Sequence, residues 1–273
     1  MTKPRPRIFI YAALPCEAKP IIAFFGLKKD VSVGAFAIYG RDELCLAVSG
    51  VGKSAMAAAV AYTQALYAAD DAPRIFLNVG IAGHKELGIG GAFLVNKIND
   101  VDTGKNYYPQ VVFKSVYPTM GLQTVSKPTQ DYPDRHLYDM EASAFYETAS
   151  RFGTAELIHC LKVVSDNQAT PATTLQPQQV AHFIAEQMPA VENILAELKH
   201  LAQLICFSEP DALALLLARY RFTVSEQAQL KNQLNRWQVL SDNQALSIPD
   251  NLPNGPAVLQ WLGQQIAVMA YSL

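Results

Sequence analysis

The sequence predicts an α/β protein built on a layered sheet, followed by a small all-helical segment. Short apolar runs typical of buried strands alternate with helical patterns over residues 1–204 of the 273-residue chain. Half of the residues are hydrophobic and 17% are charged, which excludes a disordered chain and allows a large core. After residue 204 the strand patterns stop and helical patterns remain. We therefore predict two domains, residues 1–204 and residues 205–273.

The N-terminal half alternates between the two kinds of pattern. Runs of β-branched and aromatic residues predict strands, apolar residues spaced three to four apart predict helices, and glycines mark the ends. In chain order, the expected elements are a strand at 8–14, a helix at 17–25 that ends at Gly26, a hairpin of strands at 33–39 and 44–48, a helix at 54–69, and a strand at 74–79 that runs into a turn at 80–83.

The second half of the α/β domain begins with two strands, at 91–98 and 122–126, joined by a Tyr/Pro/Lys-rich stretch of weak periodicity. A helix is expected at 140–152 and a buried strand at 157–164, which ends at Ser165 and Asp166. A polar loop at 167–177 leads to a long amphipathic helix at 178–204. Proline lacks a backbone N–H, so we expect this helix to bend near Pro189.

The C-terminal segment shows helical patterns at 210–221, 224–237 and 256–271, and Thr223 with Glu226 forms a capping-box signature before the second. Each helix carries an apolar stripe. The stripes consist of Leu213, Leu216 and Leu217, of Leu230, Leu234 and Trp237, and of Val258, Leu262 and Ile266. Fewer than about 80 residues make a marginal core alone. We therefore expect part of this surface to dock on the α/β domain or on a second subunit.

Composition excludes several classes of partner. The net charge of −2 provides no basic surface for nucleic acid or anionic membranes, and no apolar stretch reaches the roughly 18 residues of a membrane span. The four cysteines are far apart and the five histidines show no metal-ligand spacing. We therefore expect a cytoplasmic protein with reduced thiols, no metal and no cofactor.

Polar residues follow several of the expected strands, where ligands bind in open α/β sheets. Glu17 follows the first strand, residues 49–53 (SGVGK) follow the third, residues 78–83 (NVGIAG) end the fourth, and Asp166 ends the last. Each motif also has a plainer explanation. A carboxylate such as Glu17 is favoured at a helix start, glycines permit tight turns, and Asp139 is a suitable helix cap.

Four motifs occur along the chain in this order: SGVGK at 49–53, NVGIAG at 78–83, YDMEASAF at 138–145 and KVVSDNQ at 162–168. In this order and context the chain resembles the purine nucleoside phosphorylase/nucleosidase superfamily, above all the methylthioadenosine/S-adenosylhomocysteine nucleosidases. The resemblance covers roughly residues 7–200 and leaves out the helical tail. It implies a three-layer αβα sandwich with a central mixed sheet, a nucleoside substrate and a homo-oligomer, expected as a dimer.

The resemblance also implies roles for individual residues. Glu17 matches the glutamate that activates the attacking water, and Asp166, oriented by Ser165, matches the acid that protonates or hydrogen-bonds purine N7. Glu141 matches the glutamate that binds the ribose hydroxyls, with Met140 packing on the sugar. The remaining expected substrate-binding residues are Ser49, Gly80, Ile81, Ala82 and Gly83.

The chain departs from the family pattern in two places. Ile81 replaces a serine, and Asn78 stands where bacterial phosphorylases carry a phosphate-binding arginine, which favours water over phosphate as the nucleophile. The segment that supplies an aromatic contact to the base is also shortened. One alternative is that a tyrosine at 107, 108 or 117 makes this contact instead. The other is that these tyrosines serve only in packing or at the surface. His84 either lines the site or lies in a solvated loop.

Three functions therefore stay open. The first is a hydrolytic nucleosidase acting on a purine nucleoside or thionucleoside through an oxocarbenium-like transition state. The second is a phosphorylase of the same fold. The third is a catalytically weak nucleoside-binding or partner-docking protein.

Overall fold

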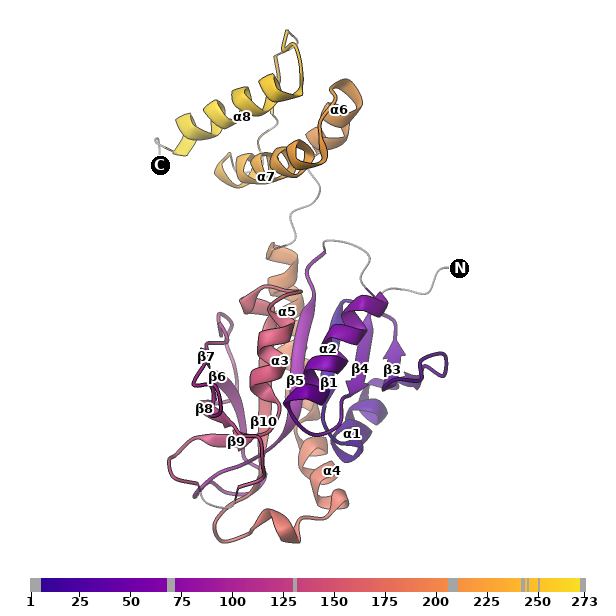
Figure 1. Ribbon diagram of the computed structural model, residues 1–273, viewed down its shortest axis with the longest axis vertical. Coiled ribbons are helices and arrows are strands. Elements are labelled where there is room, and N and C mark those ends of the chain that lie inside the picture. The colour runs from indigo at the N-terminus through magenta and orange to yellow at the C-terminus, as the bar shows by residue number, and fades with distance from the viewer. Residues whose placement is uncertain are drawn as a thin grey trace. The chain divides into compact units, whose positions relative to one another are not determined.

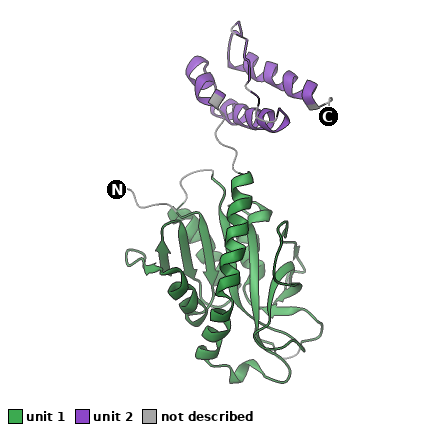
Figure 2. Ribbon diagram, turned by 180° about the vertical axis from the view of Figure 1, so that it is seen from behind, with its two compact units in different colours: residues 1–205 green, residues 206–273 purple. Residues whose placement is uncertain are grey.

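The computed structural model describes residues 6–67, 72–129, 132–205, 211–241, 244, 246–249 and 251–270. It divides the chain into two compact units, Met1–Ile205 and Cys206–Leu273 (Figure 2). The first unit is an α/β structure and the second is helical, so each has its own architecture.

The first unit is built on one mixed sheet (Figure 1). Its strands are β1 (Ile8–Ala12), β2 (Lys28–Lys29), β3 (Ala37–Arg41), β4 (Leu44–Val48), β5 (Ile75–Gly83), β6 (Ala92–Asp100), β7 (Asn106–Tyr107), β8 (Thr119–Thr124), β9 (Leu137–Asp139) and β10 (Ile158–Asp166). Their order is β10-β6-β8-β9-β5-β1-β4-β3-β2, with β7 beside β6. Strand β10 also pairs with β5 in parallel, which closes β5, β10, β6, β8 and β9 into a ring.

Helices cover both faces of this sheet. Side chains alternate along a strand, so Ile8 and Ile10 of β1 pack toward α1 (Pro15–Phe25), α4 (Pro177–Glu186) and α5 (Met188–Ile205). Phe9 and Tyr11 join the opposite cluster with residues of α2 (Lys53–Tyr67) and α3 (Ala142–Ala149). This is a three-layer αβα arrangement around a mixed sheet, which confirms the fold class predicted from the sequence.

Several boundaries differ from the predicted ones. Residues 80–83, expected as a turn, continue β5 because they pair with residues 162–166 of β10. Strand β9 was not predicted, since three residues are too few to show an alternating pattern. The helix expected to begin at residue 140 begins at Ala142, which leaves Met140 and Glu141 just ahead of it. The long helix expected at 178–204 is two helices that meet at Gln187, next to Pro189.

The second unit consists of α6 (Asp211–Arg219), α7 (Val224–Leu240) and α8 (Gly255–Ala270). The predicted capping box is present, since the Glu226 amide donates to Thr223 Oγ1 at 3.3 Å and the Thr223 amide donates to Glu226 Oε2 at 2.7 Å. The stripe residues pack mainly on one another, although Leu217 is 39% exposed. Pro210 and Tyr271, the outer limits of the predicted helices, lie outside the described residues, as do residues 68 and 69. No helix in the described ranges is long and apolar enough to cross a membrane.

Candidate active site

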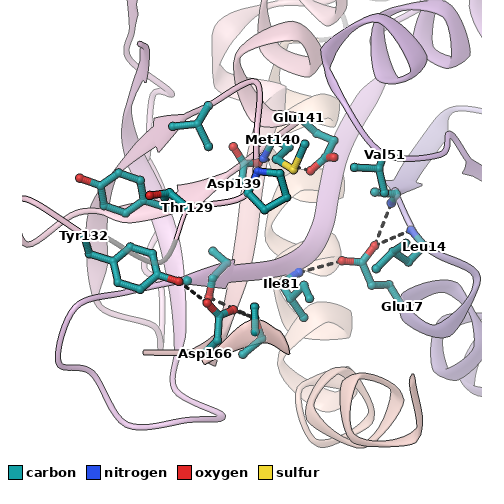
Figure 3. Close-up of a pocket in the computed structure, with 18 residues that line it drawn as sticks. Leu14, Glu17, Val51, Ile81, Thr129, Tyr132, Asp139, Met140, Glu141 and Asp166 are labelled. Atoms are coloured by element: carbon teal, nitrogen blue, oxygen red, sulfur yellow. Dashed lines mark hydrogen bonds between the residues drawn. The ribbon is translucent and has the colours of Figure 1, made fainter. Parts of the chain in front are cut away.

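A cavity of about 220 Å³ lies at the carboxyl ends of the parallel strands β1, β5 and β10 (Figure 3). Residues just after β1, the last residues of β5 and β10, and the segment between β9 and α3 line it. It brings together most of the residues predicted from the sequence: Glu17, Ile81, Ala82, Gly83, Met140, Glu141, Ser165 and Asp166. Ser49 and Gly80 do not line the cavity.

Glu17 lies in the first turn of α1 and its side chain is 2% exposed. One carboxylate oxygen accepts hydrogen bonds from the amides of Ala13 and Leu14, at 2.8 and 2.7 Å. The other accepts from the amide of Ile81 in β5, at 2.9 Å. Burial raises the pKa of Glu17, while Lys162 and these amides oppose the rise by stabilising the charged form. The carboxylate is thus held rigidly between β1 and β5.

Gly80 contributes to the site although it does not line the cavity. A Cβ at this position would lie 2.9 Å from Glu17 Oε1 and 3.4 Å from Lys162 Nζ. Only glycine leaves room for both side chains to approach the β5 backbone. Gly80 therefore has a packing role beneath Glu17, and its predicted contact with substrate stays a prediction.

Lys162 is a functional candidate that the sequence reasoning missed. Its side chain is 2% exposed and forms an ion pair with Asp139 at 2.8 Å. Burial alone would lower the pKa of Lys162, but the carboxylates of Asp139 and Glu141 outweigh burial and raise it. In the sequence, its position inside the apolar run of β10 marks this lysine, because buried lysines are almost always paired.

Glu141 lies directly before α3 and is 7% exposed. Its Oε1 accepts a hydrogen bond of 2.7 Å from the amide of Gly52, which precedes the first residue of α2. The Gly52 amide at this helix start therefore binds a carboxylate of the protein itself. Burial and the neighbouring Asp139 raise the pKa of Glu141 to about 7, although Lys162 and the Gly52 amide work against the rise.

Ser49 opens the same loop and does not line the cavity. Its hydroxyl donates to the carbonyl oxygen of Gly50 at 2.7 Å, and its amide donates to the carbonyl oxygen of Ala12 at 2.9 Å. These bonds tie the loop to the end of β1. Val51 is the residue of this loop that lines the cavity.

Asp166 ends β10 on the other side of the cavity and is 6% exposed. The Ser165 hydroxyl donates to its Oδ1 at 2.6 Å, which fits the predicted orienting role of Ser165. The Tyr132 hydroxyl donates to its Oδ2. Gly83 leaves room for this contact, since a Cβ there would lie 2.7 Å from Tyr132 Cζ and 2.8 Å from Asp166 Oδ2. Tyr132 was not predicted because it lies in a segment without periodicity.

The other candidates from the sequence lie elsewhere. Tyr107 packs against the ring of Tyr146, Tyr108 is 56% exposed, and the Tyr117 hydroxyl donates to Gln187 Oε1 at 2.9 Å. The aromatic residues that line the cavity are instead Tyr132 and Tyr138. The solvated-loop interpretation of His84 is wrong, since this residue is 3% exposed and its Nδ1 accepts from two backbone amides.

The cavity is acidic. Glu17, Asp139, Glu141 and Asp166 line it, whereas no arginine, lysine or histidine does so among the described residues. Lys162 lies behind the wall, where Asp139 neutralises it. No group of three or more histidine, cysteine, aspartate or glutamate side chains in the described ranges has the arrangement of a metal site.

Comparison with known proteins supports the fold. No protein-family model matches the sequence, and a search of curated proteins found no match either. Among solved structures, the chain is similar to the 5′-methylthioadenosine nucleosidase of Arabidopsis thaliana, with 16% identity and a TM-score of 0.59 over 71% of this chain and 96% of that chain. It is also similar to the 5′-methylthioadenosine/S-adenosylhomocysteine nucleosidase of S. pneumoniae, solved with a transition-state inhibitor, with 18% identity and a TM-score of 0.57 over 71% of this chain and 99% of that chain.

A third similar structure is a mutant futalosine hydrolase of Helicobacter pylori, with 14% identity and a TM-score of 0.52 over 70% of this chain and 99% of that chain. The chain therefore has the fold of the nucleosidases that the sequence motifs suggested.

Proposed function

We propose that the protein hydrolyses the N-glycosidic bond of a purine nucleoside or thionucleoside and releases the base. One observation carries the proposal: Glu17, Glu141 and Asp166, which are far apart in the sequence, line a single cavity at the carboxyl ends of the strands. The predicted roles need this juxtaposition, because an acid must reach the base while a second carboxylate reaches the water.

Glu17 is the proposed general base. Three amides fix its carboxylate, and it keeps acceptor capacity for one proton of a water molecule. Water attacks the anomeric carbon of the sugar, gives a proton to Glu17 and forms the new C–O bond as the C–N bond breaks. Burial raises the pKa of Glu17, which makes its carboxylate a stronger base.

Asp166 is the proposed acid for the leaving purine. A purine anion is a poor leaving group, and proton donation by a positioned side chain typically contributes about 10²–10⁴-fold. Ser165 orients the carboxyl group through Oδ1. The base then approaches Oδ2, where the Tyr132 hydroxyl lies in the free protein.

Glu141 and Met140 are the proposed sugar contacts. A carboxylate accepts hydrogen bonds from two vicinal hydroxyls, and these bonds strengthen as the ring becomes cationic in the transition state. Glu141 must be ionised for this role, and the Gly52 amide and Lys162 favour that form. Met140 lines the same wall and offers an apolar surface for the sugar.

Water is favoured over phosphate as the nucleophile. Phosphate carries negative charge and needs cationic or amide donors, whereas the described cavity lining holds four carboxylates and no cationic side chain. The named neighbours in the comparison are hydrolytic as well, and a nucleoside related to methylthioadenosine, S-adenosylhomocysteine or futalosine is the substrate class we propose.

The test is to incubate the protein with each of these nucleosides, and with adenosine and inosine, in the presence and absence of phosphate. Chromatography measures the base that is released. We expect release that does not depend on phosphate and is lost in Glu17→Gln and Asp166→Asn. Release that requires phosphate would instead identify a phosphorylase. Nucleoside binding without turnover, measured by calorimetry, would identify a binding protein.

A further inference from the structure

An ion pair outside the cavity joins α2 to the end of β6. Lys53 is the first residue of α2, and its ammonium group lies 3.1 Å from both carboxylate oxygens of Asp100 and also contacts Asp102. The side chains of Lys53 and Asp100 are 22% and 8% exposed. The contact is therefore better shielded from water than an ordinary surface pair.

Asp100 extends this contact to α3. Its Oδ2 accepts a hydrogen bond of 2.7 Å from the Ser143 hydroxyl in the first turn of that helix. Its Oδ1 also accepts from the amides of Asp102 and Thr103, at 3.1 and 3.0 Å. Burial would raise the pKa of Asp100, but the Ser143 and Lys53 hydrogen bonds dominate and lower it to about 2. Asp100 is therefore an anion at any working pH.

The network continues beneath the segment that carries Glu141. The Ser143 amide donates to Thr124 Oγ1 at 3.0 Å, and the Thr124 hydroxyl donates to Asp139 Oδ1 at 2.8 Å. Asp139 Oδ2 accepts from the amide of Ala142 at 2.8 Å. The two residues that follow Glu141 are thus fixed by buried hydrogen bonds that lead back to Lys53.

The network fixes both partners of one hydrogen bond in the site, the bond between the Gly52 amide and Glu141. Gly52, whose amide donates to Glu141 Oε1, directly precedes Lys53, while Glu141 is two residues before Ser143. Gly50 and Gly52 adopt φ angles of 84° and 100°, which are accessible mainly to glycine. Glycine backbones have access to more conformations than those of other residues, so contacts from outside the loop help to keep the Gly52 amide in place.

We propose that Lys53 and Asp100 are positioning residues for Glu141: their ion pair locks the start of α2 to the start of α3, so that the Gly52 amide holds the Glu141 carboxylate against the cavity. The inference rests on the proposed function, in which Glu141 binds the ribose. It adds a role for the lysine of SGVGK, which acts through the protein rather than on a phosphate.

The experiment compares Lys53→Met, Lys53→Arg and Asp100→Asn with the wild type. A matched control is Lys105→Met, which removes another ion pair, between Lys105 and Glu147 of α3 at 2.7 Å, that does not contact Glu141. Kinetics with methylthioadenosine and calorimetry with adenine alone separate the sugar from the base. Thermal melting and adenine stoichiometry report whether each variant is folded.

We expect Lys53→Met and Asp100→Asn to lower kcat about 10- to 100-fold, the range that a small misplacement costs, with a smaller change in KM. In the proposed function adenine contacts Asp166, away from Glu141, so its Kd should change less than about twofold. Lys53→Arg keeps the charge and reaches a carboxylate with two donors, so it should recover most of kcat. Lys105→Met should behave as the wild type.

Hydrogen exchange of the amides makes the test independent of turnover. Peptides that span residues 49–56 and 139–146 should exchange faster in Lys53→Met and Asp100→Asn, and at the wild-type rate in Lys53→Arg and Lys105→Met. If the wild type releases no base, the proposed function fails, yet this exchange pattern still tests the positioning. Two results would overturn the inference. One is an exchange rate in Lys53→Met equal to that of the wild type. The other is a loss of kcat matched by an equal loss of adenine-binding stoichiometry.

Discussion

Asp166 and Glu17 face one cavity from different strand ends, so their proposed roles can be separated by substitution. We expect Asp166→Asn to lower base release at least about 100-fold while the protein stays folded, because asparagine keeps the shape but donates no carboxyl proton. The rate of base release and the melting temperature are the measurements. A kcat close to that of the wild type would remove Asp166 from the mechanism.

The Tyr132 hydroxyl donates a hydrogen bond to Asp166 Oδ2, the oxygen that the purine is proposed to reach. Tyr132→Phe keeps the ring, which packs 5.2 Å from the ring of Tyr138, and removes the competing hydrogen bond. A hydrogen bond typically contributes about 0.5–1.5 kcal/mol, of which the ligand recovers part, so we expect adenine to bind roughly threefold more tightly.

Tyr117→Phe is the matched control for Tyr132→Phe, because the Tyr117 hydroxyl bonds to Gln187 outside the cavity. Calorimetry with adenine should show unchanged affinity for this control. Weaker adenine binding by Tyr132→Phe would show instead that the hydroxyl itself contacts the base.

Glu141 gives the site a dependence on pH whose sign is fixed by the raised pKa of about 7. An unfolded glutamate has a pKa near 4.3, so between about pH 4.3 and 7 the folded protein binds the proton more tightly. This contribution to stability is fully present below that window and is lost as the pH rises through 7. We expect the melting temperature to fall between pH 5 and pH 8, and to fall less in Glu141→Gln.

The same ionisation acts on activity in the opposite direction. The proposed contact of Glu141 with the ribose needs the carboxylate, so kcat/KM should rise with pH up to about 7. A melting temperature in Glu141→Gln that depends on pH as steeply as in the wild type would contradict the assignment of this group.

At the scale of elements, the site depends on the close approach of α1 and β10 to the backbone of β5 at Gly80. We expect Gly80→Ala to lower stability by about 1–3 kcal/mol and to reduce base release, because its Cβ would lie 2.9 Å from Glu17 Oε1. Gly88→Ala is the control, since a Cβ there meets no atom within 4 Å. Equal free energies of unfolding in urea for the two variants would show that α1 shifts to accept the Cβ with no loss of stability.

The elements also show where sequence reasoning succeeds. Strands β1 and β4 and helix α1 follow apolar runs bounded by prolines and glycines, and their predicted positions agree with the structure to within a few residues. Residues 80–83 were expected to turn because of their two glycines, but pairing with β10 outweighs that local preference. The pairing is set by residues about 80 positions away, so no local pattern reveals it.

The candidate site, too, is predicted by local patterns only in part. Motifs identified most of the carboxylates that line the cavity, because each lies at a strand end or a helix start. Lys162 and Tyr132 were missed since their roles appear only when β10 lies beside β9 and when the segment before β9 folds over Asp166. Local sequence thus predicted most of the carboxylates that line the cavity, and tertiary pairing decides what holds them.

At the scale of the whole molecule, the helical unit is an addition to a fold that is complete without it. Around 70% of this chain covers 96–99% of the length of the similar nucleosidases. Part of the tail's apolar surface was expected to dock on the α/β domain or on a second subunit. Most of its stripe residues pack in a cluster within the helical unit, and docking of the remainder stays a prediction. The predicted dimer and cytoplasmic location stay predictions.

We therefore expect residues 1–205 alone to fold, to keep the secondary structure of the α/β unit and to bind nucleoside with an affinity close to that of the full chain. Every residue of the cavity lies in this unit, and the helices on both faces of its sheet belong to it too. Circular dichroism, calorimetry and chromatography with light scattering measure the outcome on both proteins. Loss of binding in the shorter protein would mean that the tail contributes to the site. Aggregation, or a change in the number of subunits, would mean that the tail covers apolar surface of the α/β unit or of a second copy, as its stripes first suggested.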